Sequence, residues 1–164
     1  MCKKGGRRSA SVYKRYNGYF FSSISRPMGA FDIESPPYTK VESREGDAKL
    51  GEALLTTLDS YQDYCEFNEH DKEKHRQGNQ EELQQLAGVK SQTTFHRTAK
   101  NVGIELLDKR IIFNPTKKSG MTYLGLPEHK FDIASDSDIK TIGENLRKAF
   151  DMCEPKKTRK EKGT

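Results

Sequence analysis

The sequence lacks any long hydrophobic run, and this absence excludes several classes of protein. No apolar stretch among the 164 residues approaches the roughly 18–20 residues that span a lipid bilayer. The basic N-terminus is not followed by the apolar segment of a secretory signal peptide. We therefore expect a cytoplasmic protein that has no membrane partner.

Cysteines and large apolar residues are also scarce. The three cysteines, Cys2, Cys65 and Cys153, are odd in number and widely spaced, which favours reduced thiols over a disulfide framework. Leu, Ile, Val and Phe together make up 31 of the 164 residues, which is close to the composition of disordered chains. A net charge of only +5 nevertheless favours folding, and the length suits one domain with a modest core.

The positive charge lies at the two ends of the chain. Residues 1–15 contain six bases and no acid, and residues 155–164 contain five bases and one acid. Residues 16–154 therefore carry a net charge of −5 although the whole chain carries +5. The total charge would favour a nucleic-acid-binding domain, whereas this distribution indicates an acidic body with two basic ends.

The basic ends have two interpretations, solvated tails or arms that bind nucleic acid. No aromatic residue is interleaved with the bases of Lys156–Lys162, which argues against a base-stacking site. We expect a disordered basic arm over residues 1–11, one domain over 12–153, and a disordered basic tail over 154–164.

Hydrophobic spacing predicts an α+β fold with a mainly antiparallel sheet. Two hairpins are expected around Asn17-Gly18 and Asp108-Lys109, with further short strands at 121–126 and 130–134. Pro115 is expected to end the second strand of the later hairpin. Residues 25–46 are rich in proline and glycine, so they are predicted to be a loop with one short strand at 30–33.

Two principal helices are predicted at 47–58 and 138–153, because their apolar residues recur at helical spacing. Asp47 is the expected N-cap of the first. Shorter helices are predicted at 80–87 and 90–101, the latter ended by Gly103.

A weak internal repeat links the two principal helices. The sequence Leu-Gly-Glu-Ala-Leu at 50–54 aligns with Ile-Gly-Glu-Asn-Leu at 142–146. The repeat indicates either two similar strand–helix units that share one sheet, or a coincidence between two amphipathic helices. Two copies are too few for a solenoid.

The sequence contains none of the common catalytic motifs. It has no phosphate-binding glycine loop, Gly-x-Ser-x-Gly elbow, Cys-x-x-Cys or His-Glu-x-x-His. His70 and His75 are five residues apart and would face different sides of a helix, which argues against a shared metal. A small hydrolase with a Cys65–His96 pair remains an alternative. We expect no cofactor and no metal, and a binding protein rather than an enzyme.

Residues 42–82 are strongly acidic, with 12 acids against 5 bases. If residues 60–70 are helical, Tyr61, Tyr64 and Phe67 share an inward face and the acids point outward. The acids are then either a solvated helix face or a docking surface for a basic partner, such as a nuclease. The candidate partner-binding residues are Asp59, Asp63, Glu66, Glu69, Asp71 and Glu73.

Several segments, taken in order, resemble the CdiI-type immunity proteins of bacterial contact-dependent growth inhibition (CDI) systems. These segments are Lys49–Leu55, Lys90-Ser91 with Phe95, Gly103–Leu106, Ile111-Ile112 with Asn114–Thr116, and Ile142–Phe150. The resemblance covers roughly residues 12–153, and it departs from the family at Lys117-Lys118, where a histidine is usual.

The resemblance implies a non-enzymatic immunity protein. Such a protein binds the C-terminal toxin domain of a cognate exported effector, often a nuclease, and neutralises it by stoichiometric occlusion. The acidic body suits that role independently. The alternative function is a nucleic-acid-binding regulator that uses the basic termini.

Overall fold

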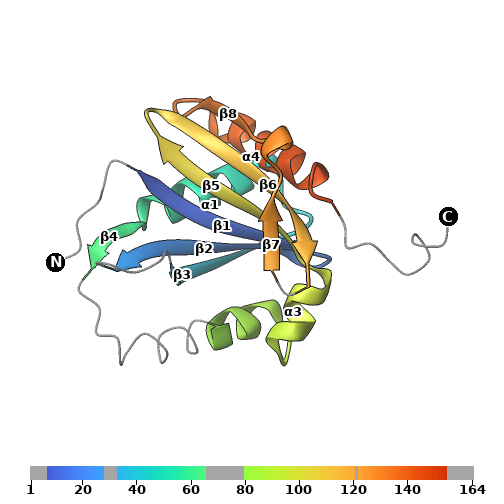
Figure 1. Ribbon diagram of the computed structural model, residues 1–164. Coiled ribbons are helices and arrows are strands. Elements are labelled where there is room, and N and C mark those ends of the chain that lie inside the picture. Colours follow the sequence, from blue (N-terminus) through green and yellow to red (C-terminus); the bar gives the residue numbers. More distant parts are fainter. Residues whose placement is uncertain (1–6, 28–32, 66–79, 121, 155–164) are drawn as a thin grey trace.

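A computed structural model describes residues 7–27, 33–65, 80–120 and 122–154 (Figure 1). Over these residues, one sheet of eight strands forms the centre of the fold. The strands are β1 Arg8–Arg15, β2 Gly18–Pro27, β3 Ile33–Glu42, β4 Gln62–Cys65, β5 Lys100–Leu107, β6 Arg110–Ser119, β7 Thr122–Gly125 and β8 Phe131–Ala134. Their order is β3-β2-β1-β5-β6-β7, and β8 also pairs with β6. Every pairing is antiparallel except that of β4 with β2, so the predicted α+β class is confirmed.

Helices cover both faces of this sheet. The long helices α1 (Asp47–Asp59) and α4 (Ile139–Asp151) pack together on one face, which confirms the two principal helices (Figure 1). A helical segment at 80–87 and the helix α3 (Gln92–Thr98) lie over the opposite face, beside β1 and β2. The 3₁₀ turn η1 (Pro127–His129) joins β7 to β8.

The weak repeat in the sequence is a duplication of the fold. β1 begins at residue 8 and β5 at 100, β2 at 18 and β6 at 110, and α1 at 47 and α4 at 139, so each separation is 92 residues. The strand pairing repeats with the same offset, because Arg15↔Gly18 becomes Leu107↔Arg110 and Gly18↔Glu42 becomes Arg110↔Ala134. The interpretation as two similar units sharing one sheet is therefore the correct one.

The two halves meet about a local twofold axis. β1 and β5 pair antiparallel, and Ser11 lies opposite Gly103, its own equivalent 92 residues later. Equivalent positions also fill the main core in pairs: Ala10 with Val102, Val12 with Ile104, Phe21 with Phe113, Leu50 with Ile142, Leu54 with Leu146, and Leu58 with Phe150. Each half thus contributes a matching set of side chains to one shared core.

The two long helices cross at a pair of glycines. A Cβ atom on Gly51 would lie 2.0 Å from the carbonyl oxygen of Ile139, and one on Gly143 would lie 1.8 Å from that of Asp47. These two contacts are equivalents under the 92-residue offset, and neither leaves room for a side chain. The glycines shared by the two sequence repeats therefore allow the helices to pack closely.

Asp47 has a different role from the one predicted. The N-cap of α1 is Gly46, and Asp47 is the first helical residue. Its carboxylate accepts a hydrogen bond of 2.5 Å from Nε of Arg147, which also donates to the hydroxyl of Tyr19 and the carbonyl of Glu45. The side chain of Asp47 therefore ties α1 to α4, because Arg147 is within its reach.

Residues 33–42 form a strand, so the prediction of a loop over 25–46 was wrong there. The β2–β3 pairing runs from Gly18↔Glu42 to Ser22↔Tyr38 and resumes at Ser23↔Ser35. Pro36 and Pro37, joined by a cis peptide bond, lie in the irregularity between these pairs. Proline has no backbone N–H group to donate to a neighbouring strand, so within sheets it is found at bulges such as this one.

The predicted helix at 90–101 is too long, because α3 ends at Thr98 and β5 begins at Lys100. Pairing with β1 from Lys14↔Lys100 onward overrides helical spacing here, and Gly103 lies inside the strand instead of ending a helix.

Pro115 does not end β6, contrary to the prediction. It lies between the segments of β6 that pair with β8 and with β7, at the point where the neighbour changes.

The structure confirms the remaining short elements with changes at their ends. Both hairpins form, although the first turn comprises Tyr16 and Asn17, one residue earlier than predicted. The strands predicted at 121–126 and 130–134 correspond to β7 and β8.

Residues 62–65 form β4 instead of a helix, because they pair in parallel with the end of β2. Residues 8–11, assigned to the basic arm, belong to β1, and residues 1–6 and 155–164 lie outside the described residues.

The Gly143→Ala substitution is expected to lower the free energy of unfolding by about 3 kcal/mol, because its methyl group forces α1 and α4 apart. Urea denaturation of the full chain measures this change. Glu144→Ala, at the neighbouring exposed position, is the control and should change the stability by less than about 0.5 kcal/mol. Equal stability of the two variants would contradict the tight crossing.

The second hairpin turn contains avoidable strain. Asp108 and Lys109 have φ angles of 52° and 61°, a backbone conformation that disfavours residues with a Cβ atom. Lys109→Gly should raise the free energy of unfolding by about 1 kcal/mol. Lys109→Ala, which removes the charge but keeps the Cβ atom, should give no comparable gain in the same denaturation experiment. A similar gain from both variants would attribute the effect to the lysine charge.

Candidate functional site

The predicted acidic site begins at one end of the sheet. Asp59 is the last residue of α1, and its side chain is 68% exposed. Asp63 lies in β4, which pairs with the end of β2. The other candidates, Glu66, Glu69, Asp71 and Glu73, lie outside the described residues. The structure thus brings Asp59 and Asp63 to the same end, and the grouping of all six remains a prediction.

Arginines near the N-terminus pair with acids at this end. Nη1 of Arg8 lies 2.5 Å from Oδ1 of Asp59, and Nη2 of Arg7 lies 2.7 Å from Oε1 of Glu105. Exposed ion pairs of this kind contribute little to stability, because water screens them and the side chains lose freedom. The carboxylates therefore remain available to a partner whose basic groups replace these arginines.

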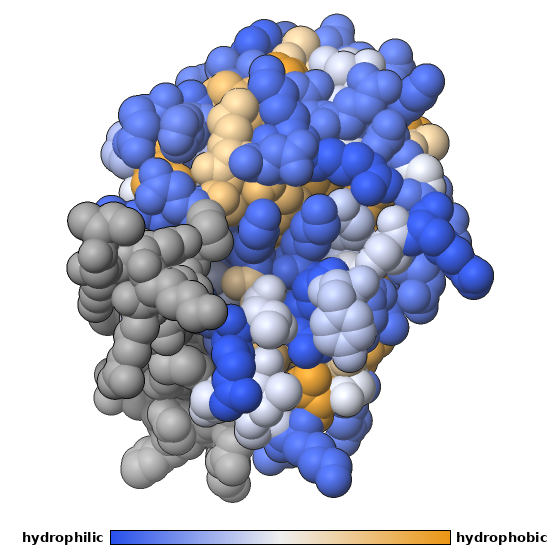
Figure 2. Space-filling model, turned by 90° about the vertical axis from the view of Figure 1, so that its right-hand side faces the viewer, coloured by the Kyte–Doolittle hydropathy of each residue, from blue (hydrophilic) through white to orange (hydrophobic). Residues whose placement is uncertain are grey.

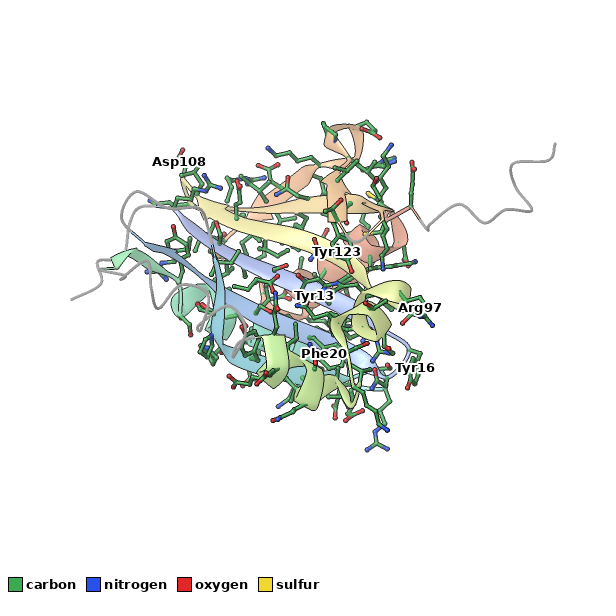
Figure 3. The ribbon with its side chains drawn as sticks, turned by 60° about the horizontal axis from the view of Figure 1, so that its bottom comes forward. Tyr13, Tyr16, Phe20, Arg97, Asp108 and Tyr123 are labelled. Atoms are coloured by element: carbon green, nitrogen blue, oxygen red, sulfur yellow. The ribbon has the colours of Figure 1, made fainter. Side chains whose placement is uncertain are left out.

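A second cluster of titratable groups lies on the sheet face opposite α1 and α4 (Figure 3). The hydroxyl of Tyr13 in β1 donates to Glu34 in β3, and Nδ1 of His96 in α3 lies 2.8 Å from the hydroxyl of Tyr123 in β7. The rings of Tyr13 and Tyr123 meet edge to face with centroids 5.8 Å apart. The network joins four elements that are distant in sequence.

Burial controls protonation in this cluster. Desolvation lowers the pKa of His96 to about 4, with a smaller contribution from the charge of Lys118, so the imidazole is neutral at pH 7. Burial also raises the pKa of the Glu34 carboxyl, against the hydrogen bonds from Tyr13 and Ser11. A histidine that resists protonation, bonded to a tyrosine, fixes α3 on the sheet rather than providing a poised acid or base.

Sequence reasoning missed this cluster. Tyr13, Glu34, His96 and Tyr123 share no local spacing that relates them. The one available signal was the alternation in β1, where Ala10 and Val12 face the main core while Ser9, Ser11 and Tyr13 point to the other side.

The hypothesis of a Cys65–His96 pair gains no support. His96 is bonded to Tyr123, and nothing is described of the Cys65 side chain. The thiol of Cys153 is buried, and burial raises its pKa, which keeps it in the unreactive protonated form. His70 and His75 lie outside the described residues.

One group of side chains has ligand atoms close enough for a metal ion. Those of Glu128, His129 and Glu154 lie within 4.8 Å of one another, near η1 and the end of α4. Both carboxylates are exposed, and exposed acids gather in this way in many proteins without a metal. We therefore do not assign a metal centre to these three residues.

One face of the molecule is predominantly polar where the described residues form it. Figure 2 shows the right-hand end of the molecule, where hydrophilic side chains dominate and hydrophobic ones occur in small groups. Tyr16, in the turn between β1 and β2, is an exception with 82% of its surface exposed. Among the described helices, none is long and apolar enough to cross a membrane.

The pKa of His96 predicts a specific acid sensitivity. Its value of about 4 in the folded state lies below the ordinary value of 6.5, so between these two pH values the unfolded chain binds more protons. Stability contributed by the neutral imidazole is present above pH 6.5 and is lost as the pH falls toward 4. His96→Gln should therefore lose less stability than the wild type over this range, in urea titrations at successive pH values. Parallel curves for the two proteins would refute this assignment.

Comparison with known proteins identifies the family. The family model described as CDI immunity protein (CdiI) matches residues 41–153, which is more than half of the chain. Two solved structures share the fold: a protein of unknown function from Neisseria meningitidis (TM-score 0.79, 13% identity) and a chain of the CdiA-CT/CdiI toxin and immunity complex from Yersinia pseudotuberculosis (TM-score 0.78, 16% identity). Each alignment covers 94% of this chain and 100% of the other. No curated protein matches the sequence significantly. The resemblance seen in the sequence is thus confirmed, and the chain belongs to the CDI immunity protein family.

Proposed function

We propose that this protein binds the C-terminal toxin domain of a cognate CDI effector and neutralises it by stoichiometric occlusion. The family match over residues 41–153 carries the proposal. It is supported by the shared fold with a chain that was solved in a toxin and immunity complex. Protection takes place in the cytoplasm, where the toxin acts on the producing cell and its siblings.

A binding role, rather than catalysis, agrees with the state of the reactive side chains in the described residues. Cys153 is a buried thiol with a raised pKa, and His96 is engaged with Tyr123. Neither is placed as a nucleophile or a base with access to substrate. The proposed protein acts by surface complementarity.

A nuclease is the toxin class that best matches the charge of the body. Residues 16–154 carry a net charge of −5, and nucleases expose basic groups that attract phosphate. The toxin-facing acids proposed here are Asp59, Asp63, Glu66, Glu69, Asp71 and Glu73. Asp59 supports this choice because its carboxylate is exposed at the end of α1. Complementary charges of this kind speed association and reject non-cognate partners.

Reversal of all six acids to lysine should abolish protection of cells that express the cognate toxin domain. Binding to the purified toxin domain should weaken by at least about 100-fold, mainly through slower association at low salt. Surface plasmon resonance at two salt concentrations measures both effects, and circular dichroism checks the fold.

The matched control reverses six exposed acids elsewhere, Glu52, Glu128, Asp136, Glu144, Asp151 and Glu154. It changes the net charge equally and should leave protection intact. Full protection by the first variant would disprove the acidic surface without disproving the immunity function. Deletion of residues 1–6 and 155–164 tests the nucleic-acid-binding alternative, because only that function depends on the basic ends and β1 stays complete.

A further inference from the structure

The duplicated sheet is covered unequally on the face opposite α1 and α4. In the first half, Phe95 of α3 packs against Tyr13 and Phe20, with ring centroids 5.2 and 5.7 Å apart (Figure 3). The 92-residue offset places Glu105 and Ile112 at the equivalent positions of the second half. Over this second half no described helix lies on that face. Leu107, at the end of β5, is 37% exposed there.

A hollow of about 120 Å³ opens where the two halves meet on this face. Its lining combines apolar and polar residues: Arg7, Ser9, Ala10, Ile24, Gly103, Ile104, Glu105 and Asn114. The space is of the size of one amino-acid side chain. The ion pair between Arg7 and Glu105 forms part of its rim, and these side chains are 40% and 27% exposed.

Gly103 is a glycine that the fold of this chain does not require. It lies in the middle of a central strand, where glycine weakens the strand because it has no side chain to pack. Its φ angle is not in the left-handed region, and a Cβ atom would meet only Asn114 Cβ at 3.7 Å, an ordinary contact. Glycine inside a strand often marks a place where another molecule approaches the backbone closely.

Two polar atoms at the hollow also have no hydrogen-bond partner among the described residues. They are Oγ of Ser9 and Nε of Arg7, both buried. The residue Ser9 as a whole is only 4% exposed. A buried polar atom without a partner costs stability, and both groups can donate a hydrogen bond to an incoming oxygen.

We propose that the toxin domain docks on this face and inserts one side chain, with an apolar stem and a neutral oxygen acceptor at its tip, into the hollow beside Gly103. The proposal rests on the immunity function and names its contact surface. The occupant contacts Glu105, the equivalent of Tyr13, against which Phe95 packs in the first half. Arg8, which follows Arg7, pairs with Asp59 of α1 on the other face, so the hollow lies at the same end of the sheet as the start of the proposed acidic surface.

Gly103→Leu tests the proposal because its side chain extends into the hollow and its Cβ atom makes only an ordinary contact with Asn114. Calorimetric titration with the purified toxin domain of the cognate effector should show affinity reduced by at least about 100-fold, at an unchanged or higher melting temperature. The control is Gly125→Leu in β7, where an added Cβ atom meets nothing within 4 Å. It should bind within about threefold of the wild type. Equal binding by both variants overturns the proposal.

Ser9→Ala gives a second test, in which the stability of the protein and its affinity for the toxin domain should change in opposite directions. Removal of the buried hydroxyl should leave the melting temperature unchanged or raise it, and should weaken toxin binding by about tenfold. Lower stability with unchanged affinity would assign Ser9 a structural role and overturn the proposal.

Two further outcomes separate the proposals. Failure of the wild type to bind or protect would refute the immunity function itself. If Gly103→Leu instead breaks a dimer in light scattering while toxin binding persists, the hollow is occupied by a second copy of this chain, and the proposal is overturned.

Discussion

The fold depends on the close crossing of α1 and α4 at Gly51 and Gly143. Each glycine contacts the backbone of the first residue of the other helix, so the helices pack without intervening side chains. This contact lets both helices cover the same face of one sheet and seal a core built from both halves. The opposite face is then left to shorter elements, which cover a second, smaller buried cluster and leave a hollow beside it.

The sequence predicted those elements whose signals are local. Helical spacing identified α1 and α4, and turn residues identified both hairpins, because each pattern records which side of a single element is buried. It failed where a distant strand decides the conformation. β3 keeps its pairing across two prolines, and β5 replaces the end of a helix because β1 is available as its partner. Such pairing is a property of the tertiary structure and leaves no periodic pattern.

The candidate sites show the same division. Acids near Asp59 could be recognised from sequence because they lie close together along the chain, and charge adds up along a segment. The cluster of Tyr13, Glu34, His96 and Tyr123 could not, because four elements bring it together. The sequence predicts Gly103 to be a helix stop and places it in one of the segments that resemble the family. Its meaning depends on the space around its backbone, which no sequence pattern reports.

The inequality between the two halves has a consequence for stoichiometry. A sheet with twofold symmetry presents two equivalent binding positions on its open face and would accept two partners. In this chain, the segment between α1 and β5 supplies α3, and Phe95 of this helix fills one of the two positions. The segment that joins the two duplicated units thus covers one of two equivalent positions, so the docking surface proposed above implies one toxin domain for each chain.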